Sequence, residues 1–251
     1  MTGPHFETTP AAADAAGAAT QDFTVMQGGG AVPGALWLPA QGSPKGLLLY
    51  GHGGSRHKRD PSVVGFVEAA IARHGFAVAA IDGPVHGARY DGPPRSGPDT
   101  QMAFRRQWEG DADDSAMAGM VADWRAALDG LTADPRLRGL PIGYYGLSMG
   151  HAFGVPLLAA DDRIAAAVIG LWGANYPNSD RLAVAAGRVR CPTLSMQMRS
   201  DELFTLDGAI ALFDALAGDD KRFLLMPGPH TLTPEQTETG LAFLARRLDI
   251  A

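Results

Sequence analysis

The chain has 251 residues, of which 46% are hydrophobic and 19% charged, as is usual for a globular protein with one full core. Its formal net charge is −6, and no cluster of basic residues indicates binding to nucleic acid or to an anionic membrane. The seven histidines lack metal-ligand spacing, and the single cysteine, Cys191, excludes an intrachain disulfide.

Targeting signals are not evident in the sequence. No apolar stretch reaches the roughly 18 residues that a transmembrane helix needs. Residues 1–22 are rich in alanine and threonine, and they lack the basic start and apolar centre of a secretory signal. We therefore expect residues 1–22 to form a disordered tail, residues 23–251 to form one domain, and the protein to be cytoplasmic.

Apolar runs of strand length alternate with segments of helical period along residues 23–251. Strands are predicted at residues 23–27, 34–38, 46–50, 76–81, 141–145, 164–171, 192–198 and 222–226. Helices are predicted at residues 62–74, 113–131, 151–160, 206–216 and 233–248, the last opened by a capping-box pattern at Thr233. Apolar strands that alternate with helices predict an α/β fold, with a mostly parallel sheet covered on both faces.

Residues 83–112 interrupt this alternation with a long segment rich in glycine, proline and arginine. Compact domains rarely carry so long a loop without a role, so we expect residues 83–112 to form a lid or a pocket wall. Residues 172–190 are a second candidate wall, and the candidate pocket residues are Arg89, Trp108 and Trp172. Four arginines either bind a substrate carboxylate or form a solvated surface: Arg89, Arg95, Arg105 and Arg106.

The stretch Gly146-Leu147-Ser148-Met149-Gly150 reads G-x-S-x-G and lies between a predicted strand and a predicted helix. That context is typical of a nucleophile elbow, in which a sharp turn presents the serine hydroxyl above the sheet. The flanking glycines permit the turn, because side chains there would clash with the neighbouring strand and helix. Ser148 is therefore the candidate nucleophile.

A serine hydroxyl needs a general base, and the base needs an orienting carboxylate. After such an elbow the expected order along the chain is Asp or Glu, then His. His230 follows the last predicted strand and is the candidate base, whereas His151 lies on the elbow helix and is expected to point away. Asp201 follows the strand at 192–198 and is the candidate carboxylate, with Glu202 as the alternative.

An oxyanion intermediate also needs backbone N–H donors. The Met149 N–H, at the start of the elbow helix, is one candidate donor. The loop after the strand at 46–50 supplies the other, with Gly54 as the first choice and Gly53 as the second. The side chain of His52 is expected to brace this loop.

These motifs resemble those of the α/β-hydrolases, and within that superfamily the dienelactone hydrolase and prolyl-oligopeptidase-like esterases. The residues that carry the resemblance are Gly51 to Gly54, Asp82 to Gly87, Gly146 to Gly150, Asp201, and Pro229 with His230. The resemblance implies an eight-stranded sheet, a Ser-His-Asp triad, and no metal or organic cofactor. Dienelactone hydrolase itself has a cysteine where this chain has Ser148. His86 resembles a position that steadies its loop in the family.

The expected activity is hydrolysis of carboxylic esters of small molecules through an acyl-enzyme. The same site would also suit a thioesterase, an amidase or small peptidase, or an acyltransferase, because these enzymes share that intermediate. From another class, a catalytically silent ligand-binding protein of the same fold is the alternative. Cofactor-free oxidation or C–C cleavage is a third possibility. The sequence predicts neither a nucleic-acid nor a membrane partner, and it does not indicate the oligomeric state.

Overall fold

The computed structural model describes residues 6–8, 12–13, 18–90, 92–93 and 96–250. The strands are β1 (Phe6–Thr8), β2 (Ala12–Ala13), β3 (Ala18–Gln27), β4 (Gly30–Pro39), β5 (Gly46–Gly51), β6 (Phe76–Ile81), β7 (Ile142–Leu147), β8 (Ile164–Gly170), β9 (Thr193–Met198) and β10 (Lys221–Met226). The helices are α1 (Pro61–His74), α2 (Gly97–Gly110), α3 (Ser115–Ala133), α4 (Met149–Ala160), α5 (Asp180–Ala186), α6 (Leu206–Ala215) and α7 (Pro234–Arg247), with a 3-10 turn, η1, at Gly87–Arg89.

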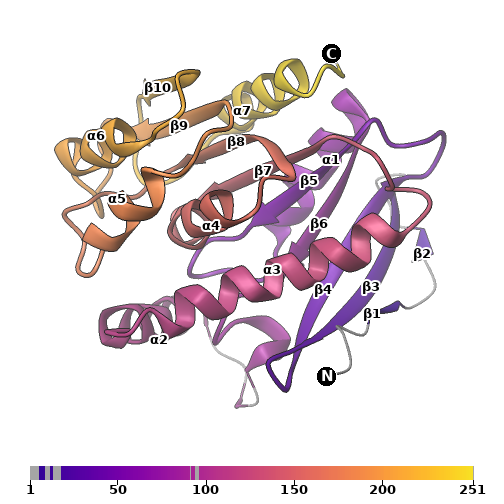
Figure 1. Cartoon of the computed structure of the whole chain (residues 1–251), viewed down its shortest axis with the longest axis horizontal. Helices are drawn as coiled ribbons and strands as arrows, with labels where there is room; N and C mark the ends of the chain where they lie inside the picture. The colour runs from indigo at the N-terminus through magenta and orange to yellow at the C-terminus, as the bar shows by residue number, and fades with distance from the viewer. Residues whose placement is uncertain (1–5, 9–11, 14–17, 91, 94–95, 251) are drawn as a thin grey trace.

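The strands of the described chain form one twisted sheet (Figure 1). Its eight long strands have the order β3-β4-β6-β5-β7-β8-β9-β10, and the short strands β1 and β2 both pair with β3. All pairings from β6 to β10 are parallel, whereas β3 and β4 run antiparallel to their neighbours. The predicted mostly parallel, eight-stranded sheet is confirmed, with two short strands added at its N-terminal edge.

Helices cover both faces of the sheet, and each face has its own apolar core. Because successive side chains of a strand point to opposite faces, Leu47 and Leu49 of β5 join one core and Leu48 joins the other. Helices α3, α4, α5 and α6 contribute to the first core, and α1 and α7 contribute to the second. Figure 1 shows α3 and α4 on one side of the sheet, with α1 and α7 on the other.

The N-terminal prediction needs correction where the structure describes these residues. Ala18 to Asp22, predicted as part of a disordered tail, belong to β3 and pair with β4. Thr20 lies opposite Trp37 in that pairing and is buried, which is why a segment of low hydrophobicity is ordered. Short strands also form within the predicted tail at β1 and β2, while residues 1–5, 9–11 and 14–17 lie outside the described residues.

The segment 83–112 is the second difference, because half of the expected loop is helix α2. The Ser96 side chain caps this helix by accepting a hydrogen bond from the Asp99 N–H (3.2 Å), and Pro98 occupies its first turn. Likewise, the second expected wall, residues 172–190, contains α5. The capping box predicted at Thr233 is present at the start of α7.

None of the helices in the described part of the chain is both long enough and apolar enough to cross a membrane.

Candidate active site

Ser148 occupies the predicted elbow between β7 and α4. Its backbone has φ 57° and ψ −122°. Residues other than glycine rarely adopt this conformation, which costs about 1–3 kcal/mol. Surrounding structure holds it there, since the Ser148 N–H donates to the Gly170 carbonyl of β8 (2.9 Å). The elbow tolerates only glycine nearby: a Cβ at Gly146 would lie 2.7 Å from the Gly150 oxygen, and one at Gly150 would overlap the Gly51 carbonyl.

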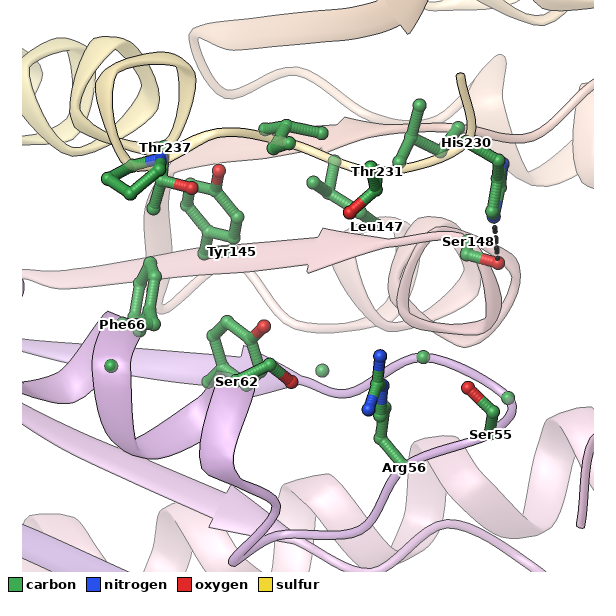
Figure 2. A pocket seen from close by; sticks show the side chains of 18 of the residues that line it. Ser55, Arg56, Ser62, Phe66, Tyr145, Leu147, Ser148, His230, Thr231 and Thr237 are labelled. Atoms are coloured by element: carbon green, nitrogen blue, oxygen red, sulfur yellow. Dashed lines mark hydrogen bonds between the residues drawn. The ribbon is translucent and has the colours of Figure 1, made fainter. Parts of the chain in front are cut away.

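His230 reaches Ser148 from the loop after β10. Its Nε2 lies 3.0 Å from the Ser148 Oγ (Figure 2), although the two residues are 82 positions apart. Gly228, at φ 125°, turns the chain just before it, and the imidazole packs against the Phe204 ring at 5.4 Å between centroids. The predicted base and the predicted nucleophile are therefore brought within hydrogen-bond distance.

Asp201 completes a hydrogen-bonded chain with these two residues. Its Oδ2 accepts from the His230 Nδ1 (2.9 Å), while its Oδ1 accepts from the Leu203 and Phe204 N–H groups (2.9 and 3.1 Å). Burial raises the pKa of this carboxyl, but the bonds from His230 and the two N–H groups outweigh it, so the pKa is lowered overall. An ionised Asp201 holds the proton on Nδ1, which leaves Nε2 free to accept from the serine.

Glu202, the alternative carboxylate, has a different contact. Its Oε2 accepts from the backbone N–H of His230 (2.9 Å), whereas the imidazole is bound by Asp201. A second backbone bond, from the Ser200 N–H to the Gly228 carbonyl (3.0 Å), joins the same two loops. Glu202 thus fixes the position of the loop that carries His230.

The loop after β5, which contains Gly53 and Gly54, lies beside the elbow and lines the same groove as Ser148. The Gly53 carbonyl accepts from the Arg56 N–H (3.0 Å) and from the His52 Nδ1 (2.9 Å). Because a trans peptide points its N–H opposite to its carbonyl, these bonds orient the Gly54 N–H, which shares that peptide. At the elbow, the Met149 N–H lies in the first turn of α4, where backbone donors have no partner within the helix.

Two buried histidines brace this loop. The His52 Nε2 accepts from the Gly83 N–H (2.9 Å), and the His86 Nε2 lies 2.9 Å from the Gly54 carbonyl. Burial, with the neighbouring His86, lowers the pKa of His52 to about 3. His52 is therefore neutral, as its contacts require, and is bound to the backbone on both ring nitrogens.

Two cavities of different size open at Ser148. The larger, a groove of about 440 Å³, runs from Ser148 and His230 along Leu147 and Tyr145 to Phe66 of α1 and Thr237 of α7 (Figure 2). The smaller, of about 10 Å³, is lined by Ser148, Gly54, Phe104, Trp172, Leu203 and Phe204. This arrangement suits a substrate with a large group on one side of the atom that Ser148 attacks and a small group on the other; we call these groups its two arms.

Two of the three predicted pocket residues, Arg89 and Trp108, line neither cavity at Ser148. Arg89 is bound to Asp123 (2.6 Å) and to the Asp82 carbonyl, so it does not face the groove. Trp108 is buried among Phe104, Phe153 and Trp172, and its indole N–H donates to the Pro177 carbonyl (2.8 Å).

Some residues of the expected walls do lie near Ser148. Gln101 lines both cavities, while Arg105 and Trp172 line the small one. Arg95 lies outside the described residues. Helix α1 and the start of α7 also contribute to the groove, and the sequence did not single them out as pocket walls.

Among the described residues, no group of three or more His, Cys, Asp or Glu side chains is arranged to hold a metal ion.

Comparisons with known proteins identify relatives by structure. No family model matches the sequence, and no curated protein matches it either. A cold-adapted esterase from an Arctic intertidal metagenomic library has 32% sequence identity and a TM-score of 0.82, with 94% of this chain and 97% of that chain covered. Two acetyl xylan esterases show the same fold. The enzyme from Paenibacillus sp. R4 has 18% identity and a TM-score of 0.74, covering 98% of this chain and 90% of that chain. The enzyme from Thermoanaerobacterium sp. has 15% identity and a TM-score of 0.70, covering 99% and 89%. The sheet order, the elbow and the 32% identity to the cold-adapted esterase over nearly the whole chain together show that the chain belongs to the α/β-hydrolase superfamily.

Proposed function

We propose that the protein is a serine hydrolase that cleaves carboxylic esters through an acyl-enzyme. The observation that carries this proposal is the chain of hydrogen bonds from Ser148 through His230 to Asp201, at 3.0 and 2.9 Å, at the head of a groove. The 32% identity to an esterase over nearly the whole chain supports the same activity.

In the first half of the reaction, Ser148 attacks the ester carbonyl while His230 removes its proton. Negative charge then develops on the carbonyl oxygen, and the N–H groups of Met149 and Gly54 stabilise it. His230 donates the proton to the leaving alcohol as the C–O bond breaks. Asp201 keeps the imidazole in the required tautomer and stabilises its positive charge.

In the second half, a water molecule replaces the departed alcohol. His230 removes a proton from this water, which attacks the acyl carbon of the Ser148 ester. The acid is released, and Ser148 recovers its proton from His230. Water and the alcohol therefore both approach from the side of His230.

The proposal is tested by the hydrolysis of p-nitrophenyl acetate. Ser148→Ala should lose at least about 10⁴-fold in kcat, because it removes the nucleophile. Ser55, which lines the same groove, offers a matched control, and Ser55→Ala should retain activity within a few-fold. Equal activity of Ser148→Ala and the wild-type protein would exclude an acyl-enzyme on Ser148.

A panel of thioester and amide analogues of the same acyl group separates an esterase from a thioesterase or amidase. We expect the oxygen ester to have the highest kcat/KM relative to its uncatalysed hydrolysis. A higher relative value for the thioester would reassign the substrate while leaving the roles of Ser148 and His230 unchanged.

A further inference from the structure

The two cavities at Ser148 differ in more than their size. His230 lines the groove of about 440 Å³, but it is not among the residues that line the cavity of about 10 Å³. The Phe204 ring packs against the imidazole and forms part of the wall of the small cavity. The proton-transferring nitrogen is thus accessible from the groove.

This asymmetry assigns the two arms of the ester, given the acyl-enzyme reaction proposed above. The leaving oxygen must lie within hydrogen-bond reach of the His230 Nε2, because it receives a proton as the ester bond breaks. The alcohol therefore extends into the groove that His230 lines. The acyl carbon is bonded to Ser148, so its substituent is left with the small cavity on the other side.

The small cavity limits the length of the acyl chain. On the same measure the small cavity has about 10 Å³ and the groove about 440 Å³, so the small cavity suits a short acyl substituent such as a methyl group rather than a long chain. One side of it is a packed group of aromatic rings, in which Trp172 lies 4.6 Å from Phe204 and 6.2 Å from Phe104 between centroids. Gln101, Arg105 and Leu203 also line it. Because all three rings are buried, a longer chain could not extend between them without displacing the core.

The groove, by contrast, has the volume of a small-molecule site. Apolar and aromatic side chains of Leu147, Tyr145 and Phe66 lie along it, with the Thr231 and Thr237 residues on the α7 side (Figure 2). The Phe66 and Tyr145 rings are 4.7 Å apart between centroids, so they form one aromatic part of the groove wall. The groove also carries the polar side chains of Arg56, Arg73 and Gln101, so it suits a large alcohol with an apolar body.

We propose that the substrate is an ester of an acetyl-sized acid with a bulky alcohol that has an apolar body. The alcohol lies in the groove between α1 and the start of α7, and the acyl methyl group lies in the small cavity between Phe104, Trp172 and Phe204.

The test compares two isomeric esters that carry the same biphenyl group on opposite sides. Biphenyl-4-ylmethyl acetate has the bulk on its alcohol, and methyl biphenyl-4-ylacetate has it on its acid. We expect kcat/KM to be at least about 100-fold higher for the acetate, since even one misplaced methylene changes the specificity of a tight pocket by about 10- to 200-fold. Equal values, or a preference for the methyl ester, would overturn the assignment.

Two substitutions test each cavity separately. Leu203→Ala enlarges the small cavity and keeps the backbone N–H that donates to Asp201. It should raise the ratio of kcat/KM for benzyl butyrate to kcat/KM for benzyl acetate by about 10-fold. Gly65→Phe should fill the groove, because Gly65 lines it and a Cβ there meets nothing within 4 Å. It should lower kcat/KM for biphenyl-4-ylmethyl acetate about 10-fold while ethyl acetate changes little.

Gly119 provides the matched control for the second substitution. It also lies in a helix, α3, and a Cβ there meets nothing within 4 Å, but it does not line the groove. Gly119→Phe should therefore leave both acetates unchanged. An equal loss in Gly119→Phe and Gly65→Phe, or no change in selectivity in Leu203→Ala, would contradict the assignment of the arms.

Failure of this inference is distinguishable from failure of the proposed function. If p-nitrophenyl acetate is hydrolysed in a Ser148-dependent manner but the methyl ester is the better isomer, only the assignment of the arms is wrong. If Ser148→Ala hydrolyses both isomers as fast as the wild-type protein, the serine mechanism fails first.

Discussion

Substitution of Asp201 by asparagine probes the hydrogen-bonded chain with little change in volume. All four contacts of the carboxylate are with donors: two backbone N–H groups on Oδ1, and His230 with the Gln197 amide on Oδ2. The new NH₂ group cannot face the two backbone N–H groups, so it must take the position of Oδ2. Gln197 accommodates this by rotating its amide, since its Oε1 has no partner among the described residues.

An NH₂ group at that position donates to the His230 Nδ1 and forces the proton onto Nε2. In that tautomer Nε2 faces the Ser148 hydroxyl, 3.0 Å away, as a donor and cannot remove its proton. The corresponding change in a serine protease lowers kcat about 10⁴-fold, equivalent to about 5.4 kcal/mol, and we expect a loss of the same order here.

Steady-state hydrolysis of p-nitrophenyl acetate measures the effect, with kcat lowered and KM within a few-fold. Glu202→Gln is the matched control: its amide oxygen can still accept the His230 backbone N–H, so less than a 10-fold loss is expected. Near-full activity of Asp201→Asn together with a collapse in Glu202→Gln would refute the assignment of the acid to Asp201.

Three further predictions concern the loop, a buried histidine and the corrected pocket. Gly54→Ala places a Cβ 3.0 Å from the Phe104 ring and should lower kcat about 10- to 100-fold. In the control Gly53→Ala the nearest atom to the Cβ is 3.9 Å away, and kcat should stay within a few-fold of the wild-type value. Equal losses of kcat in the two variants would contradict the proposed role of the Gly54 N–H. Burial lowers the pKa of His151 to about 3, so the folded state stays neutral while the unfolded chain gains a proton below about pH 6.5, and stability falls as the pH drops towards 3. Urea unfolding should show that His151→Leu loses about 2 kcal/mol less than wild type between pH 7 and 5; parallel losses would contradict the buried neutral state. Arg89→Ala leaves Asp123 buried without its partner, and should lower the unfolding free energy by about 2 kcal/mol while kcat/KM changes less than 3-fold; a selective loss of activity would return Arg89 to the substrate pocket.

Local sequence signals predicted the frame of the candidate site well. The strand β6 has the predicted bounds, and the elbow lies between strand β7 and helix α4 as its glycine pattern indicates. Asp201 and His230 each follow a parallel strand, and the carboxyl ends of such strands meet at one edge of the sheet. Their convergence on Ser148 could therefore be expected from chain order alone.

The pocket could not be predicted in the same way, because it depends on contacts between distant segments. Trp108 lies in the long segment 83–112 and was therefore predicted to line a pocket, yet its side chain packs in the core beside Phe153 of α4. Phe66 has the spacing of a core residue on α1, yet it also lines the groove with Tyr145 of β7. Helix α2 did have a local signal, the cap at Ser96 followed by Pro98, but the glycine and proline content of its surroundings concealed it.

The most direct test of the central claim is to map the site of covalent labelling by a fluorophosphonate. The phosphonyl group should be found by peptide mass spectrometry on Ser148 of the wild-type protein. Labelling should be lost in Ser148→Ala and greatly slowed in His230→Ala. Absence of an adduct on active protein, or an adduct on another serine such as Ser55, would contradict the account.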